Sequence, residues 1–316
     1  MSEPGTAESS TRTVVVAVLV NLAIAVAKGV AAAFTGSVAL WAETAHSLAD
    51  TGNEILLYVG LRRSGRPADD RHPYGYGQER WFWTLLAAIG IFVIGGLFSI
   101  VEGVEALLHP KPLTDVPVGI AVLVVSFVLE AVSWRTARAQ LREEARARRR
   151  SIGEHLRRAS DPTAATVLLE DSAALVGIAL ALAAIALHWL TGWAVWDAGA
   201  GILIGVLLVA VAYLIVHRSA TLLIDQSAPP DVLDRLRARI GEETWVRRIE
   251  KLTAVYIGPG RLLVTAQLLP VAEMSRLPAE VVVERAYALR ADLCAAEAIG
   301  DVEITLVPES DRHSST

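Results

Sequence analysis

Residues 196–217 read WDAGAGILIGVLLVAVAYLIVH, and no charged side chain occurs between Asp197 and His217. An α-helix needs about 20 apolar residues to cross the hydrocarbon core of a bilayer, and this run has that length. Similar runs lie earlier in the chain, at residues 13–33, 38–60, 82–107, 116–138 and 164–190. The sequence therefore predicts an α-helical membrane protein with six transmembrane helices.

The composition of the whole chain supports this class. Its 316 residues are 53% hydrophobic and 20% charged, with a mean hydropathy of +0.44, which is too apolar for a disordered chain. The net charge of -5 argues against a basic face for nucleic acid, so no nucleic-acid partner is expected. The single cysteine, Cys294, excludes an intrachain disulfide and a cysteine-based zinc site.

Arginine in the loops predicts the orientation. Arginines gather in the segments 62–80 and 135–158, whereas the short connections between the other spans contain one basic residue, Lys111. Because loops rich in Lys and Arg stay in the cytoplasm, both of these segments and both termini are expected there. Residues 1–12 are polar and acidic, unlike an Arg-rich transit peptide, which favours a bacterial plasma membrane.

A small soluble domain is predicted after the last span, where the composition changes near residue 226. Hydrophobic periodicity there gives the order α-β-β-α-β, a small α+β sandwich. The expected helices are 231–240 and 278–296, and the expected strands are 248–257, 262–269 and 301–307. The predicted plan is a disordered tail over 1–12, a transmembrane domain over 13–225, a cytoplasmic domain over 226–308 and a mobile tail over 309–316.

The second span carries the first candidate chemistry, and its residues 40–60 read LWAETAHSLADTGNEILLYVG. Glu43, His46, Asp50 and Asn53 are spaced by three, four and three residues, which places them on one helical stripe. Ionisable groups are costly inside a membrane unless they face a polar cavity, a partner or an ion. The alternative is a set of groups satisfied by hydrogen bonds between helices.

The fifth span adds Glu170 and Asp171 at a comparable depth. One imidazole with up to three carboxylates suits a tetrahedral divalent ion such as Zn²⁺. These ligands must lose protons to bind a metal, so metal and protons compete for them.

Three stretches carry a resemblance to a known family. AHSLADTG at 45–52, RPADDRHPYGYGQERWFW at 66–83 and LLEDSAALVG at 168–177 resemble the cation diffusion facilitators. The resemblance implies a six-span metal/proton antiporter with a cytoplasmic ferredoxin-like domain that forms a homodimer. Its details are most similar to the branch that includes mitochondrial zinc exporters.

The resemblance also implies a central metal site. His46 and Asp50 match the ligand pair of the second span, and Asp171 matches one ligand of the fifth. The other matching position is Val167, where many zinc transporters have His. Glu170, about 60° away around the helix, can swing toward that gap. The predicted metal ligands are therefore His46, Asp50, Asp171, Glu170 and Asn53.

Two other regions bind metal in relatives but contain fewer candidate ligands in this sequence. Asp69 and His72 match a loop site, but Tyr76 stands where some bacterial members have His, and a structural turn is the favoured interpretation. No histidine occurs between 228 and 308, so no dinuclear zinc site is expected in the soluble domain.

Other motifs have simpler interpretations. Gly201 and Gly205 in the sixth span are typical of close helix packing, since no strand precedes them as a nucleotide loop requires. Three acids in the third and fourth spans could line a cavity or face partners: Glu102, Glu105 and Glu130.

The leading hypothesis is a divalent-metal efflux transporter that exchanges zinc for protons within membrane lipid. Mn²⁺, Co²⁺, Ni²⁺ and Fe²⁺ stay open as cargo because one His is missing. No catalytic residue and no bound cofactor are expected. One alternative is a non-transporting metal sensor or scaffold with a degenerate site. Another is an intramembrane hydrolase, but no catalytic motif surrounds Ser47 or Ser172.

Overall fold

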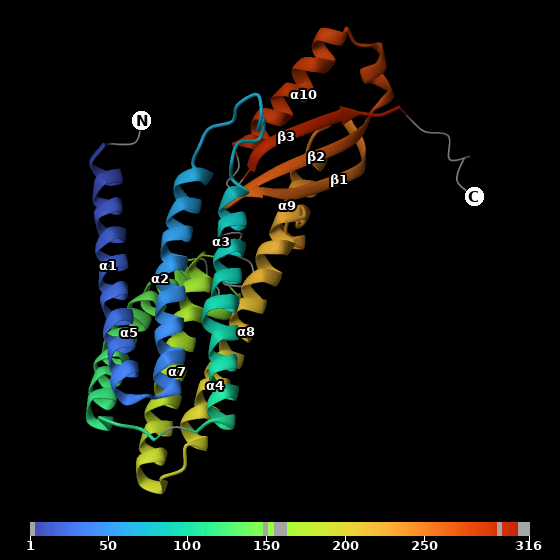
Figure 1. Cartoon of the computed structure of the whole chain (residues 1–316). Helices are drawn as coiled ribbons and strands as arrows, with labels where there is room; N and C mark the ends of the chain where they lie inside the picture. Colours follow the sequence, from blue (N-terminus) through green and yellow to red (C-terminus); the bar gives the residue numbers. More distant parts are fainter. Residues whose placement is uncertain (1–3, 111, 148–150, 155–162, 296–298, 309–316) are drawn as a thin grey trace, which may run out of the picture. The chain divides into compact units, whose positions relative to one another are not determined.

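The structure is a computed structural model that describes residues 4–110, 112–147, 151–154, 163–295 and 299–308 (Figure 1). The chain divides into two compact units. One unit comprises Met1–Arg62 with Trp81–Ala220, and the other comprises Arg63–Arg80 with Thr221–Thr316. The tail predicted over 309–316 lies outside the described residues.

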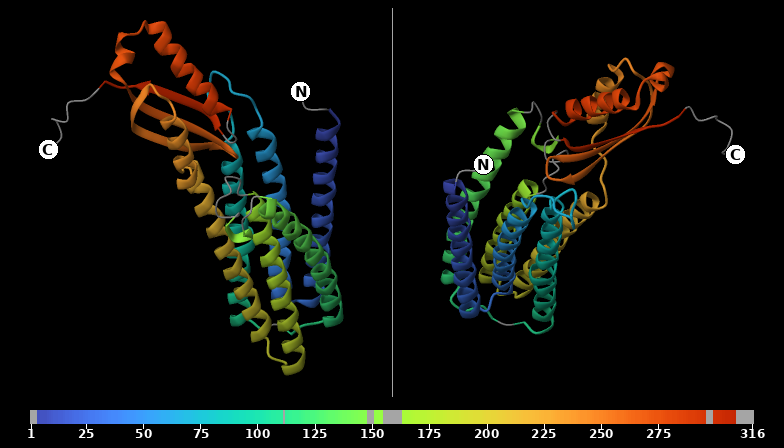
Figure 2. Two further views of the ribbon diagram at one scale, coloured as in Figure 1. Left: turned by 180° about the vertical axis from the view of Figure 1, so that it is seen from behind. Right: turned by 90° about the horizontal axis from the view of Figure 1, so that it is seen from above.

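Long helices that run alongside one another form the first unit (Figure 2). The third span is continuous, because α3, the π-helical segment η1 and α4 follow one another without a break. The elements are α1 Pro4–Thr35, α2 Val38–Ser64, α3 Glu79–Gly90, η1 Ile91–Leu97, α4 Phe98–Leu108, α5 Val116–Ala147, α7 Thr163–Thr191 and α8 Val195–Leu223.

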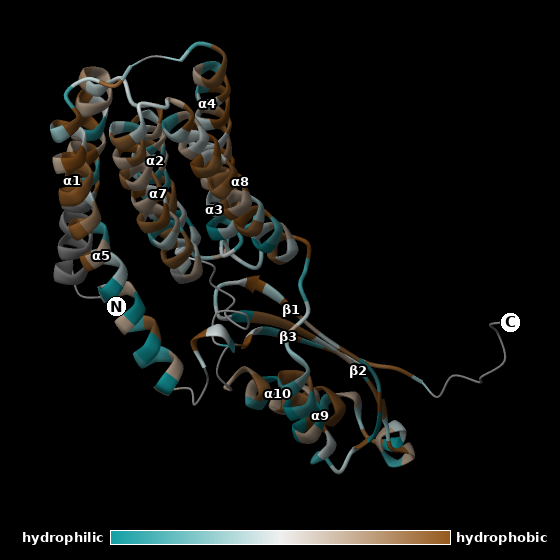
Figure 3. Cartoon of the chain, turned by 90° about the horizontal axis from the view of Figure 1, so that it is seen from below, coloured by the Kyte–Doolittle hydropathy of each residue, from teal (hydrophilic) through white to brown (hydrophobic). Residues whose placement is uncertain are grey.

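Hydropathy marks most of these helices as membrane spans, and apolar residues predominate along α4 and α8 (Figure 3). Large apolar side chains point outward, as contact with lipid requires; Val128 is 56% exposed and Leu214 is 52% exposed. Among the described residues, five segments are long and apolar enough to cross a membrane: Val18–Thr35, Glu79–Leu108, Val116–Ala147, Ala165–Thr191 and Val195–Leu223.

The remaining predicted span, α2, is a helix of 27 residues but is not among those five segments. Its polar residues, including Glu43, His46 and Asp50, lower its hydropathy below that of a lipid-facing helix. Helix length and position still match the prediction, so the α-helical membrane fold class is confirmed.

The first helix differs from the sequence prediction at its start. A disordered tail was expected over 1–12, whereas α1 begins at Pro4. Proline is favoured in the first turn of a helix, and no glycine or proline between Thr6 and Thr35 interrupts the helix except Gly29. Residues 1–3 lie outside the described part of the chain.

Glycines bring α8 close to its neighbours. A Cβ atom added at Gly205 would lie 2.8 Å from the carbonyl oxygen of Gly96 in η1. A Cβ added at Gly201 would lie 2.9 Å from a methyl carbon of Val38 in α2. Small residues let membrane helices approach in this way. The interpretation of both glycines as packing residues is therefore confirmed.

Replacing Gly205 by Ala should lower the thermal unfolding midpoint of the purified protein in detergent. The added methyl group must push η1 away from α8, and overpacking of this kind costs about 1–3 kcal/mol. Gly199→Ala on the same helix is the control, since a Cβ there meets nothing within 4 Å. Equal midpoints for the two variants would contradict the packing argument.

The second unit contains a small sheet with two helices on one face (Figure 3). The strand order is β1-β2-β3, with β1 antiparallel to β2 and β2 parallel to β3. This arrangement confirms the predicted order α-β-β-α-β. The elements are α9 Pro230–Gly241, β1 Val246–Gly258, β2 Arg261–Pro270, the 3-10 turn η2 Ala272–Arg276, α10 Ala279–Cys294 and β3 Ile299–Leu306.

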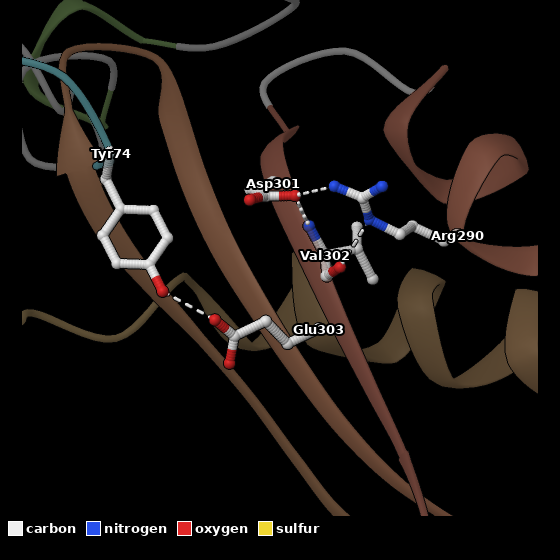
Figure 4. Close-up of polar contacts among 5 residues, drawn as sticks. All are labelled: Tyr74, Arg290, Asp301, Val302 and Glu303. Carbon is white, nitrogen blue, oxygen red and sulfur yellow. Dashed lines mark hydrogen bonds and ion pairs between the residues drawn. The ribbon is translucent and has the colours of Figure 1, made fainter. Parts of the chain in front are cut away.

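The loop 63–80 belongs to this second unit and docks on its sheet. The Tyr74 hydroxyl donates a hydrogen bond of 2.6 Å to the Glu303 carboxylate on β3 (Figure 4). At the end of β1, a Cβ added at Gly77 would lie 2.6 Å from the carbonyl oxygen of Ile257. The loop backbone therefore lies directly against the strand, at a distance that only glycine allows.

An ion pair joins α10 to the same strand. Arg290 donates to the Asp301 carboxylate at 2.7 Å and to the Val302 carbonyl at 2.9 Å (Figure 4). The hydrogen bond from Arg290 lowers the pKa of Asp301 below its usual range. The pair is partly exposed, so it orients β3 more than it stabilises the domain.

Tyr74→Phe should make the loop more sensitive to trypsin, which cuts after the exposed Arg71. Losing one hydrogen bond of about 1 kcal/mol should raise the undocked population, and with it the cleavage rate, about fivefold. The control is Tyr287→Phe, since Tyr287 is 63% exposed on α10. Cleavage at the wild-type rate in Tyr74→Phe would show that the hydrogen bond does not hold the loop.

Candidate metal site

A cavity of about 360 Å³ lies among α1, α2, α5 and α7 of the helical unit. Much of its lining is acidic, although these helices belong to the bundle of membrane spans. Besides Asn21, Asn53, Ser133 and apolar side chains, it is lined by Asp50, Glu54, Glu130, Glu170 and Asp171. Carboxylates this close repel one another, so they are stable together only when protons or a cation reduce their charge.

Several oxygen atoms at this cavity have no hydrogen-bond donor. Asn53 donates through Nδ2 to Glu170 Oε2 at 2.5 Å, and the two side chains are 2% and 3% exposed. Asn53 Oδ1 and Glu170 Oε1 are buried without a hydrogen-bond partner. Glu54 accepts from Asn21 at 2.7 Å through Oε1, while its Oε2 is buried without a partner. All three atoms are acceptors, and a buried acceptor without a donor costs about 1–3 kcal/mol.

The two aspartates lie beside this pair. Asp171 is 8% exposed and accepts a hydrogen bond of 3.3 Å from the Ser133 hydroxyl. Glu170 lies within electrostatic reach of Asp50, Asp171 and Glu54. Val167 lines the same cavity, so an apolar side chain occupies the position where a histidine would otherwise reach in.

The structure places four of the five predicted metal ligands at the cavity and one elsewhere. Asp50, Asn53, Glu170 and Asp171 line the cavity, whereas His46 does not. His46 is 3% exposed and its Nδ1 has no partner. Its backbone lies beside η1, because a Cβ added at Gly95 would lie 3.9 Å from the His46 Cα. Within the described residues, no three His, Cys, Asp or Glu side chains are arranged to hold one metal ion.

The sequence analysis missed a buried ion pair that Glu43 of α2 forms. Lys28 of α1 is fully buried and donates to Glu43 at 2.9 Å and to the Ser47 hydroxyl at 2.8 Å. Glu43 is also fully buried, and Gly177 leaves room for its carboxylate, since a Cβ there would clash with Oε1. The signal was present, because a lone lysine within an apolar span requires a partner.

Two more polar residues at the cavity were also missed. Glu54 follows Asp50 by four residues and therefore shares its helix face, and Asn21 is its partner on α1. Glu130 was already a candidate for cavity lining, and the structure places it there.

The loop match at Asp69 and His72 forms a turn in which the carboxylate is already used. Asp69 accepts from the backbone N–H groups of Arg71 and His72 and, at 2.7 Å, from the Tyr76 hydroxyl. The hydrogen bond from Tyr76 is the main cause that lowers the pKa of Asp69 below its usual range. These contacts favour the structural interpretation of the loop over a second metal site.

Comparison with known proteins identifies the family. Residues 14–224 match the family model described as the cation efflux transmembrane domain. The chain belongs to the cation efflux family. This family corresponds to the cation diffusion facilitators, so the resemblance drawn from the three sequence stretches is confirmed.

Relatives in this family include proteins of both mitochondria and bacteria. The chain is 32% identical over 257 residues, 81% of its length, to the proton-coupled zinc antiporter SLC30A9, mitochondrial, of Xenopus laevis. It is 32% identical over 229 residues, 72% of its length, to metal tolerance protein C4 of Arabidopsis thaliana. It is 30% identical over 199 residues, 63% of its length, to the cation-efflux pump FieF of Escherichia fergusonii.

These matches cover 46%, 50% and 60% of the relatives' own lengths, so the chain spans about half the length of the mitochondrial antiporter and the plant protein. As a cation efflux family member with apolar spans, the chain is an integral multi-pass membrane protein that is similar to mitochondrial zinc exporters.

Lys28→Met should destabilise the protein strongly, because it leaves the Glu43 carboxylate buried without a cation. Breaking a buried pair in this way costs about 3–5 kcal/mol, which thermal unfolding in detergent would detect. Lys28→Met combined with Glu43→Gln should recover most of the loss. If the double variant melts no higher than Lys28→Met, the ion pair is not the source of the effect.

Proposed function

We propose that this chain exports a divalent metal ion, with zinc as the predicted cargo, in exchange for protons. Cargo binds at the cavity of α2 and α7 through Asp50, Asn53, Glu170 and Asp171. The observation that carries the proposal is the group of buried acceptor oxygens without donors at this cavity. A metal cation can bind to these oxygen atoms, whereas another hydrogen-bond acceptor on a neighbouring helix cannot satisfy them.

Proton exchange follows from the charge of the cavity. Its five carboxylates cannot all be ionised in a low-dielectric region without a counter-charge. When a divalent ion binds, it displaces protons from its ligands, and when protons return they expel the metal. The relatives named as proton-coupled zinc antiporters support the same coupling for this chain.

The choice of metal depends on which atoms of the cavity bind it. The atoms without partners are oxygens, which suit Mn²⁺ and Fe²⁺ as well as Zn²⁺. His46 does not line the cavity, so it contributes an imidazole only if α2 moves relative to its neighbours. A π-helical segment such as η1 is where a helix changes its register at functional sites. We propose that His46 joins the site in another state of the transport cycle, as alternating access requires.

We also propose an orientation, a membrane and a dimer contact for the transporter. Arg-rich loops support an orientation with both termini in the cytoplasm. A bacterial plasma membrane fits the FieF relative, whereas the SLC30A9 relatives are named as mitochondrial. The soluble α-β-β-α-β domain over 226–308 is proposed to form the contact of a homodimer. The transmembrane domain over 13–225 is surrounded by lipid, and the protein is neither an enzyme nor a nucleic-acid binder.

A non-transporting sensor or scaffold is the second candidate. It is favoured by one observation, namely that no three metal-binding side chains within the described residues converge on a point. A sensor would bind metal without moving it, so flux separates the two candidates.

The test is metal flux into sealed proteoliposomes of the purified full chain, with and without a pH gradient. Zn²⁺, Mn²⁺, Co²⁺, Ni²⁺ and Fe²⁺ are run in parallel for wild type and Asp171→Asn. We expect flux that follows the proton gradient and falls about 100-fold or more in the variant, since even outer-shell changes at metal sites cost about 10–100-fold.

The control is Asp234→Asn, which alters an exposed carboxylate on α9 and should keep the wild-type rate. Flux at the wild-type rate in Asp171→Asn would refute the site. Metal binding without flux for every ion would instead establish the sensor or scaffold.

A further inference from the structure

A second cavity of about 140 Å³ lies within the helical unit, at the end where short turns join α1 to α2 and α7 to α8 (Figure 1). It is formed by the start of α2, the end of α4, the end of α7 and the start of α8. Its ionisable lining consists of Glu102, Glu105, His109, His188 and Asp197. The transport site described above uses none of these residues.

Among the residues at this cavity, His188 gives the evidence for a ligand. Its side chain is 8% exposed, and its Nδ1 is buried without a hydrogen-bond partner. A buried imidazole nitrogen normally has a hydrogen-bond partner, so an unpartnered histidine in the wall of a cavity is available to a metal ion or to water. His188 also lies within electrostatic reach of the Asp197 carboxylate.

Asp197 supplies charge but few free lone pairs. Its carboxylate accepts from the Ser37 hydroxyl and the Val38 N–H, both at 2.5 Å, and from the Ala39 N–H at 3.4 Å. It therefore caps the N-terminus of α2 and is 3% exposed. The negative charge nevertheless stays at the edge of the cavity, where it attracts cations.

Glu102 and Glu105 of α4, with His109 just after its end, complete the set. Glu102, Glu105 and His109 are spaced by three and four residues, so they lie on one stripe that ends at the cavity. Neither glutamate forms an ion pair with another residue in the described part of the chain, and no Lys or Arg is among the lining residues. A cavity lined by acids without basic partners concentrates cations.

We propose that this cavity is a second divalent-cation site, at which His188, Glu102 and Glu105 bind a transition-metal ion of the class that the protein transports. The inference rests on the proposed function for the source of the ion. The volume accommodates an ion with part of its water shell, since a liquid water occupies about 30 Å³. Because no three of these side chains converge within the described residues, part of the contact is through water and the site is weak.

A weak site at this end is useful to a transporter. The positive-inside pattern places the short turns on the non-cytoplasmic side. An ion that leaves the central cavity would then meet carboxylates that stabilise it before release. Sites along an ion path must bind well enough to be entered and weakly enough to be left.

The test uses the accessibility of His109, which is exposed beside the cavity. Purified full-length protein is treated with diethylpyrocarbonate with and without Zn²⁺, and modification is quantified at each histidine by mass spectrometry. We expect saturating Zn²⁺ to slow modification of His109 at least fivefold. His217, also exposed but on the distant part of α8, serves as the internal reference and should be unaffected.

Two variants assign the effect. Glu102→Gln with Glu105→Gln should abolish the protection of His109, and His188→Gln should raise the Zn²⁺ concentration needed for it at least fivefold. Asp171→Asn should leave the protection intact, which separates this site from the central one even if the proposed transport fails. Absence of protection in wild type up to millimolar Zn²⁺, or protection that survives the double glutamate variant, would overturn the inference.

Discussion

The helix α2 carries more ionisable groups than a bilayer tolerates on a single helix, and the arrangement of its neighbours follows from that constraint. Glu43 is neutralised by Lys28 of α1, and Glu54 accepts from Asn21 of the same helix. Asn53 reaches Glu170 of α7. Each contact satisfies a polar group that would otherwise face lipid. The polar groups of α2 thus determine which faces of α1 and α7 turn inward, whereas its apolar residues could pack in many ways.

The helical unit has two kinds of interface, and they have different mechanical properties. Where α8 meets η1 and α4, glycines let the backbones touch, and few rearrangements are possible without a clash. Where α2 meets α1, α5 and α7, a cavity with acidic walls separates the helices. Tight packing on one side and a polar cavity on the other is the arrangement that a rigid-body motion of one group of helices against another requires. Alternating access around a central site uses that kind of motion.

The fold was largely predictable because run length and periodicity are local properties of the chain. They gave the six spans and the order α-β-β-α-β of the soluble domain. The pairing of Lys28 with Glu43 was not predictable in the same way, since it depends on how two helices are rotated against each other. The same limit applies to His46. Its spacing from Asp50 shows that both lie on one side of α2, but only the packing of the helices shows that His46 is buried away from the cavity that Asp50 lines.

The position of Lys28 bears on how an ion could move between the two cavities. Along α2, Asp50 lines the central cavity and Trp41 lines the second one, a separation of about 13 Å at 1.5 Å per residue. Glu43 lies between them, with the Lys28 ammonium group bound to it. Both side chains are fully buried, so water does not reach this pair. A divalent cation that has neither water nor ligands around it is very costly in a low-dielectric region. In this conformation the ion has no hydrated path past the pair, so the helices must move for it to cross. The buried pair thus favours the proposed carrier mechanism over an open channel.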